Sequence, residues 1–195
     1  MITLKFGGTS MANARRILSS ADIIIDSAKE DRLSVIVSAV AGVSNNLQSA
    51  IDACTTGIPY INYVEDLRKI HSDICSELQS KCEGFNADKA MEKINPLFEE
   101  LEKLLAGCVS FGECPSTVHC RIMGMGELLS SPIMEAVLLA KGMSVILLDS
   151  RKFVFTTGNQ LEGEADYAKC KEACMPFRDG ENKSQTRILL FSGFI

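Results

Sequence analysis

The chain has 195 residues, of which 46% are hydrophobic and 23% charged, the length and composition of one globular domain. Its formal net charge is −5 and it contains no run of lysine and arginine, so it lacks the electrostatic signature of a nucleic-acid-binding protein. No stretch approaches the roughly 20 apolar residues of a membrane span, and the N-terminal residues resemble neither a secretory signal nor a transit peptide. We therefore expect a cytoplasmic protein with no membrane and no nucleic-acid partner.

The N-terminal part predicts a strand, a helix and a second strand. Residues 2–6 alternate as a short strand, and residues 11–29 place apolar side chains at helical spacing, with Ser10 as the expected cap. Residues 33–38 form an unbroken apolar run, which is typical of a strand covered on both faces of a parallel sheet. Such a unit has a right-handed crossover in nearly all proteins.

The middle of the chain predicts helices. A helix is expected to begin near Val43, and residues 60–105 read as a long helical insertion made of two amphipathic helices with a break at 82–86. We expect this insertion to flank the functional site. A looser stretch follows, and residues 126–142 predict a helix that ends at a glycine.

The C-terminal part predicts a buried strand at 144–149, a short helix at 166–175, a polar loop at 176–184 and a last strand at 187–195. The alternation of strands and helices indicates an α/β fold in three layers, α/β/α, with a mostly parallel sheet. Because the chain ends on a strand with no helix returning from it, we expect residues 1–195 to be an incomplete domain. An open sheet edge favours association, so a homo-oligomer is also expected.

Eight cysteines raise the question of disulfides or a metal site. The densest group is Cys108, Cys114, His119 and Cys120, whose spacing lacks the close ligand pairs of a structural zinc site. We predict reduced thiols that are buried or idle, and we assign no metal-ligating residue.

The stretch KFGGTS, residues 5–10, suggests an anion site. Gly7 and Gly8 follow a strand, and glycine allows a ligand to approach the backbone amides closely. Lys5 adds a positive charge, while Thr9 and Ser10 add hydroxyl donors, so the group suits phosphate. The pattern matches neither of the common nucleotide-binding glycine motifs. A plain tight turn beside a surface lysine therefore stays an open alternative.

Three blocks of the sequence resemble aspartokinases of the amino-acid kinase family. They are KFGGTSM at 5–11, VIVSAVAGVSNNL at 35–47 and GMGELLSSPIMEAVLLAKG at 124–142. Their order and separation fit that family, as does the closing LLFSGFI. The resemblance implies that residues 1–195 are the N-terminal portion of an amino-acid kinase catalytic domain.

The resemblance also implies roles for individual residues. Lys5 would be catalytic, and with Gly7, Gly8 and Thr9 it would hold the phosphates of ATP, which acts with Mg²⁺. Four further residues would bind L-aspartate: Ser38, Ser44, Glu127 and Phe194. Ser44 stands where the family usually has threonine, and Glu127 would pair with the α-ammonium group. Taken alone, Ser38 also fits a strand end, Ser44 a helix cap and Glu127 a helix N-terminus.

The function implied is transfer of the γ-phosphoryl group of ATP to the side-chain carboxylate of aspartate, giving 4-phospho-L-aspartate, the first step towards lysine, threonine and methionine. The later glycine-rich block of the family, which reads like R-G-G-S-D-Y, is not in the sequence, so we expect little kinase activity from the chain alone. Two alternatives stay open. One is a non-catalytic fragment that binds aspartate or a protein partner, and the other is a kinase acting on a different carboxylate.

Overall fold

The computed structural model describes residues 1–158, 163–179 and 188–193. Its main sheet has the strand order β1-β2-β6-β3, and every neighbouring pair is parallel. The strands are β1 (Ile2–Phe6), β2 (Leu33–Val37), β6 (Ile188–Ser192) and β3 (Val145–Leu148). The expected mostly parallel sheet is confirmed. A second, two-stranded antiparallel sheet of β4 (Thr156–Thr157) and β5 (Glu164–Ala165) was not foreseen.

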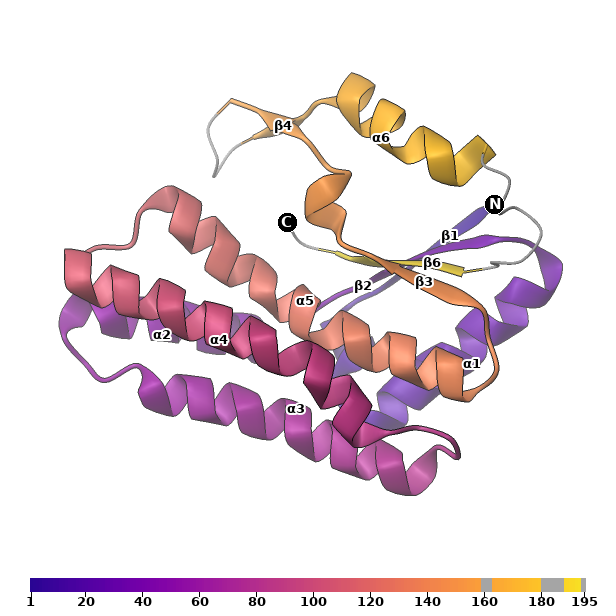
Figure 1. Cartoon of the computed structure of the whole chain (residues 1–195), viewed down its shortest axis with the longest axis horizontal. Coiled ribbons are helices and arrows are strands. Elements are labelled where there is room, and N and C mark those ends of the chain that lie inside the picture. The colour runs from indigo at the N-terminus through magenta and orange to yellow at the C-terminus, as the bar shows by residue number, and fades with distance from the viewer. Residues whose placement is uncertain (159–162, 180–187, 194–195) are drawn as a thin grey trace.

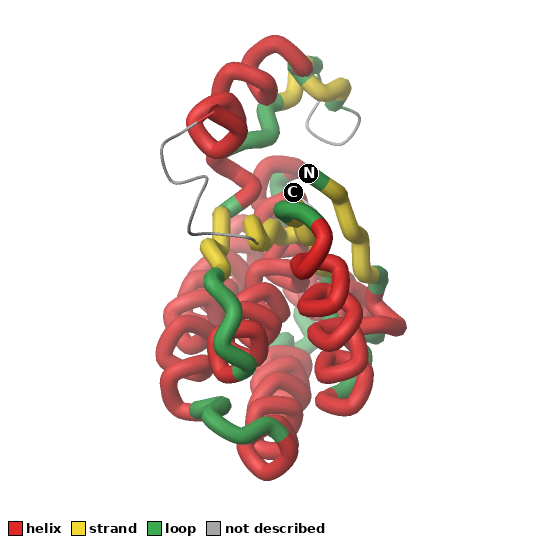
Figure 2. The backbone as a smooth tube through the Cα atoms, turned by 90° about the vertical axis from the view of Figure 1, so that its right-hand side faces the viewer, coloured by secondary structure: helices red, strands yellow, loops and turns green. Residues whose placement is uncertain are grey.

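The sheet lies between two unequal helical layers (Figures 1 and 2). One layer contains α1 (Ala14–Glu30), α2 (Val43–Thr56), α3 (Ile61–Lys81), α4 (Ala87–Phe111) and α5 (Ser116–Ala140). The other contains α6 (Tyr167–Asp179), where the Phe177 ring meets Phe153 edge-on, and Phe153 in turn meets Phe191 of β6. The three-layer α/β/α prediction is therefore confirmed.

The first helix begins later than the sequence predicted. A single 3₁₀ turn, Gly8–Met11, follows β1, and α1 begins at Ala14. Its cap is Asn13, whose side chain accepts from the Arg16 amide at 3.0 Å, so the expected Ser10 cap was wrong. Asn13 lies in extended conformation, the geometry that an N-cap requires. The glycine pair thus precedes a 3₁₀ turn, not the first turn of α1.

The expected helical pair at 60–105 is confirmed as α3 and α4, which flank α2 and α5 and share one hydrophobic core with them. The prediction of a looser stretch after this helical pair was wrong, because α4 continues to Phe111 and α5 starts at Ser116. Leu105 and Cys108 are buried on the same face of α4 as Phe98, and this packing continues the helix through Gly107.

Helix α5 crosses the sheet and is largely enclosed. Among the described residues it is the one helix long and apolar enough to cross a membrane, and 78% of that apolar window is buried inside the protein. It contacts β2, β3 and β6 as well as four of the helices. Its apolar composition is thus explained by its place in the core. It ends as predicted before a glycine, Gly142, which has a left-handed φ of 78°.

Four of the cysteines are buried, namely Cys54, Cys75, Cys82 and Cys108, as predicted. Burial raises the pKa of the Cys54 thiol and of the Cys75 thiol to about 11 each. Since the thiolate is the reactive form, these two thiols are inert at neutral pH.

The helical layer also buries a histidine. His71 is fully buried on α3, donates from Nδ1 to the Leu67 carbonyl at 2.7 Å and meets the Phe98 ring edge-on at 5.8 Å. Its Nε2 has no hydrogen-bond partner. Burial lowers the pKa of His71 despite the bond to Leu67, because a proton on Nε2 would place an unpaired charge in the core.

This arrangement predicts acid-sensitive stability. Below the unfolded pKa of 6.5 the unfolded chain binds a proton that the folded chain does not, so stability falls as pH drops through 6.5 towards the lower folded pKa. The slope from this one group is at most about 1.4 kcal/mol per pH unit. Thermal unfolding between pH 7.5 and 5.5 should show the loss, and His71→Gln should reduce it. The matched variant His119→Gln, at a partly buried histidine beside Gln48, should not.

Candidate functional site

The site expected from the sequence lies where the parallel strands end. The carboxyl ends of β1, β2, β6 and β3 meet at one edge of the sheet, as they must in a parallel sheet (Figure 1). Backbone bonds join the ends: the Ser38 amide donates to the Phe6 carbonyl at 3.0 Å, and the Gly193 amide donates to the Val37 carbonyl at 2.8 Å. This is the edge at which open α/β sheets bind ligands.

Ser38 and Glu127 meet at this edge, although they are 89 residues apart in the chain. The Ser38 hydroxyl donates to Oε1 of Glu127 at 3.4 Å, and the Ala39 amide also donates to this carboxylate. Glu127 is only 6% exposed, and its Oε2 has no hydrogen-bond partner. A buried carboxylate with one free oxygen is arranged to accept a hydrogen bond from a cationic ligand.

Burial also sets the charge state of Glu127. It raises the pKa of the Glu127 carboxyl, while hydrogen bonds from the Ala39 amide and the Ser38 hydroxyl oppose the rise. A bound ammonium group would favour the ionised form further, because an opposite charge nearby stabilises the carboxylate. Binding of a cationic ligand at Glu127 would therefore be coupled to deprotonation of its carboxyl.

The turn after β2 is fixed against α5 by residues that sequence reasoning missed. The Ser130 hydroxyl donates to the Ser38 carbonyl at 2.8 Å, and the Ser131 hydroxyl donates to the Glu127 carbonyl at 2.5 Å. At Gly126 a Cβ atom would lie 2.8 Å from the Cβ of Ala39, so only glycine lets the helix approach this closely. The signal in the sequence was the run of small residues within an otherwise apolar helix.

The turn that follows β1 lies against the turn that follows β2. A Cβ atom at Gly8 would lie 3.4 Å from the Ala39 carbonyl oxygen, so these two turns are in close contact. Gly7 has an ordinary extended backbone, with φ −80° and ψ 174°, and a Cβ there would meet nothing within 4 Å. Glycine at this position is thus required neither by backbone strain nor by crowding. The absence of a side chain at this exposed residue leaves open space beside the turn.

Lys5 is exposed near the end of β1, level with Ile36 of β2. Within the described part of the chain its side chain makes no hydrogen bond or ion pair, so the ammonium charge is available to a ligand. Thr9 is also exposed, in the 3₁₀ turn that follows Gly7.

Ser44 is the second residue of α2 and is exposed. It does not cap this helix, because Gly42, with a left-handed φ of 86°, occupies the cap position. Ser44 therefore has its hydroxyl free of a capping role. Phe194 lies outside the described residues, and its predicted role beside the substrate stays a prediction.

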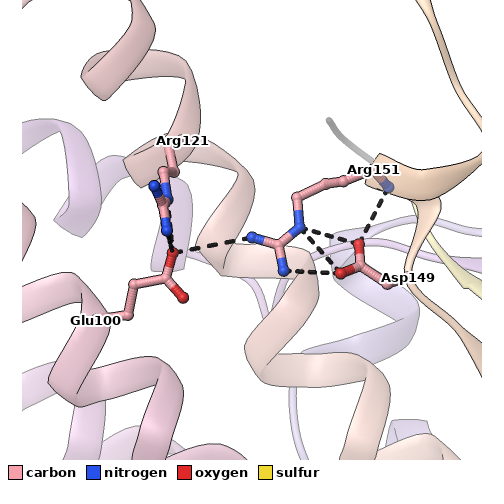
Figure 3. Close-up of polar contacts among 4 residues, drawn as sticks. All are labelled: Glu100, Arg121, Asp149 and Arg151. Carbon is pink, nitrogen blue, oxygen red and sulfur yellow. Dashed lines mark hydrogen bonds and ion pairs between the residues drawn. The ribbon is translucent and has the colours of Figure 1, made fainter.

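A network of charged side chains lies at the carboxyl end of β3, on the same edge of the sheet (Figure 3). Arg151 binds Asp149 through Nε at 2.9 Å and Nη2 at 2.8 Å, and its Nη1 lies 3.9 Å from Glu100 of α4. Glu100 also pairs with Arg121 of α5 at 2.5 Å. The Arg151 guanidinium lowers the pKa of the Asp149 carboxyl. These contacts hold the β3 end to two helices, beside a cavity of about 270 Å³ that reaches Ser131 and Ser192.

Residues 1–187 match the model of the amino acid kinase family. The chain belongs to this family. It is 29% identical to the bifunctional aspartokinase/homoserine dehydrogenase of Buchnera aphidicola, over 100% of this chain and 24% of that protein. It is 30% identical to aspartokinase 1, chloroplastic, of Arabidopsis thaliana, over 79% of this chain and 26% of that protein.

The fold is that of solved aspartokinases. The structure of Escherichia coli aspartokinase III in complex with aspartate and ADP matches with a TM-score of 0.83 and 24% identity, over 100% of this chain and 41% of that chain. The same enzyme in complex with lysine and aspartate matches with a TM-score of 0.81 and 22% identity. The amino acid kinase chain described here therefore has an aspartokinase-like fold and spans less than half the length of these relatives.

Proposed function

We propose that this amino acid kinase chain binds L-aspartate and serves the transfer of the γ-phosphoryl group of ATP to its side-chain carboxylate. The observation that carries the proposal is the buried Glu127 carboxylate, which lies beside Ser38 at the carboxyl edge of the sheet. Its Oε1 accepts from the Ser38 hydroxyl, while its Oε2 has no hydrogen-bond partner among the described residues. The names of the relatives point to the same substrate. Transfer to another carboxylate is less well supported, because no observation on this edge favours it.

The proposed reaction does not require a general base. The side-chain carboxyl of aspartate has a reference pKa of about 3.9, so the nucleophile is already ionised at neutral pH. The protein must instead bring two anions together and stabilise the charge that spreads over the phosphoryl oxygens. In this proposal Lys5 neutralises the phosphates, the Gly7 and Gly8 amides cradle them with Thr9, and Glu127 orients aspartate through its ammonium group.

The residues present fit ATP bound with Mg²⁺, but they suggest no separate metal site. The space at Gly7 and the free Lys5 charge suit phosphates. Across residues 1–158, 163–179 and 188–193, no group of three or more His, Cys, Asp or Glu side chains could hold a metal ion. Mg²⁺ would supply charge neutralisation on the ATP phosphates. A cytoplasmic location and a homo-oligomer stay predictions from the sequence.

Glu127→Gln tests the proposal. Titration calorimetry should show saturable binding of L-aspartate to the chain, and the substitution should weaken it by about 30-fold or more, the usual cost of removing one partner of a buried charge pair. Glu135→Gln is the matched control, because Glu135 is also buried on α5 but pairs with Lys93 at 2.6 Å.

The control should bind aspartate like the unmodified chain. Succinate, which lacks the ammonium group, should bind weakly to all three proteins. No saturable binding of aspartate by the unmodified chain would refute the proposed function.

A further inference from the structure

Within the described part of the chain, three buried side-chain polar atoms have no hydrogen-bond partner: His71 Nε2, Glu127 Oε2 and Ser192 Oγ. His71 lies among the helices. The other two lie at the carboxyl edge of the sheet, where the substrate is proposed to bind. Buried polar groups in proteins are nearly always paired, so two free acceptors at one edge require an explanation.

Ser192 is the last residue of β6 and is 4% exposed. It is level with Val37 of β2, and both residues are buried. The residue after Val37 is Ser38, whose hydroxyl donates to Glu127. Ser192 therefore lies one strand across from the residue that contacts the Glu127 carboxylate.

The cavity beside β3 supports this placement. It is lined by Ser192 together with Leu128 and Ser131, which belong to the same turn of α5 as Glu127. The Ser192 carbonyl is already paired, since it accepts from the Ser150 hydroxyl at 2.7 Å. The fold thus uses the Ser192 carbonyl but leaves its hydroxyl without a partner. For packing alone, alanine would serve at this position as well as serine.

We infer that Ser192 is a further substrate-contact residue, whose hydroxyl accepts a hydrogen bond from the ammonium group that Glu127 also binds. This inference rests on the proposed function and extends it. An ammonium group has three N–H donors and no acceptor, so it requires several oxygen atoms around it. Glu127 Oε2 supplies a charged acceptor and Ser192 Oγ a neutral one.

Ser192→Ala tests the inference with two readouts. Calorimetry should show about tenfold weaker binding of L-aspartate and unchanged binding of succinate. The melting temperature without ligand should not fall, because the substitution removes a buried group that has no partner. Ser192→Thr, which keeps a hydroxyl, should retain most of the affinity. Ser150→Ala is the structural control, and it should lower the melting temperature because it leaves the Ser192 carbonyl unpaired.

Each other outcome overturns the inference. If the unmodified chain binds aspartate and Ser192→Ala binds it equally well, the role of Ser192 is refuted while the proposed function stands. If Ser192→Ala weakens aspartate and succinate alike, or melts as early as Ser150→Ala, the hydroxyl is structural. If the unmodified chain binds no aspartate, the proposed function fails and this inference fails with it.

Discussion

Replacing Lys5 with methionine should lower any ATP-dependent formation of aspartyl phosphate by about 100- to 1,000-fold, the usual effect of removing one group that stabilises transition-state charge. Two unit charges 4 Å apart interact by about 1 kcal/mol in water and about 4 kcal/mol near a protein surface. Because Lys5 is exposed, its effect on ATP binding should lie near the lower value. The greater loss should appear in turnover, where the phosphoryl group carries most charge.

Two measurements separate this effect from a loss of stability. The Lys5 side chain makes no hydrogen bond or ion pair among residues the structure describes, so Lys5→Met should melt at the temperature of the unmodified chain. Lys103→Met, at an exposed lysine of α4, is the matched control and should leave nucleotide binding and turnover unchanged. Lys5→Arg should restore only part of the activity, because a planar guanidinium does not replace a compact ammonium charge. Equal nucleotide affinity and turnover in Lys5→Met would refute the phosphate role.

The strands were predictable because their pattern is local. A mainly apolar run such as residues 33–38 favours a strand with both faces covered, and β2 is one of the two inner strands of the sheet. The strand order was not predictable. Nothing in the residues of β6 says that it enters between β2 and β3, because this choice depends on how α5 packs across the sheet.

Helix ends were harder to predict than helices. Gly107, Gly112 and Pro115 suggested a loose stretch, yet only the last two lie outside a helix. A Cβ atom at Gly107 would meet nothing within 4 Å, so the structure does not require glycine at this position. A glycine within a helix costs only about 1 kcal/mol of stability. The burial of Leu105 and Cys108 offsets it.

The residues of the candidate site were also only partly predictable from the sequence. Ser38 and Glu127 were chosen from a resemblance to aspartokinases, and the structure brings them into contact. No spacing rule would have paired two residues so far apart. Ser130 and Ser192 were missed because their environments depend on tertiary structure. The Ser130 hydroxyl meets the Ser38 carbonyl, and the Ser192 hydroxyl is buried without a partner, only once the strands and α5 are assembled.

Phe98→Ala should cost about 3–5 kcal/mol of stability, which is the usual range for removing a buried phenylalanine. Phe98 is fully buried on α4, meets His71 edge-on and carries the Arg68 guanidinium 4.6 Å from its ring centre. The substitution would leave a cavity between α3 and α4 and would remove both ring contacts. For a chain of this length the loss corresponds to a melting temperature lower by about 6–20 °C.

Phe111→Ala supplies the matched control, because Phe111 ends the same helix but is 76% exposed. Its substitution should change stability by no more than about 0.5 kcal/mol. The cavity should also admit water near His71, and since burial is what lowers the pKa of His71, Phe98→Ala should move that pKa back towards 6.5 and flatten the acid dependence of stability. Equal melting temperatures for the two variants would mean that α3 and α4 do not belong to the same cooperative core as the sheet.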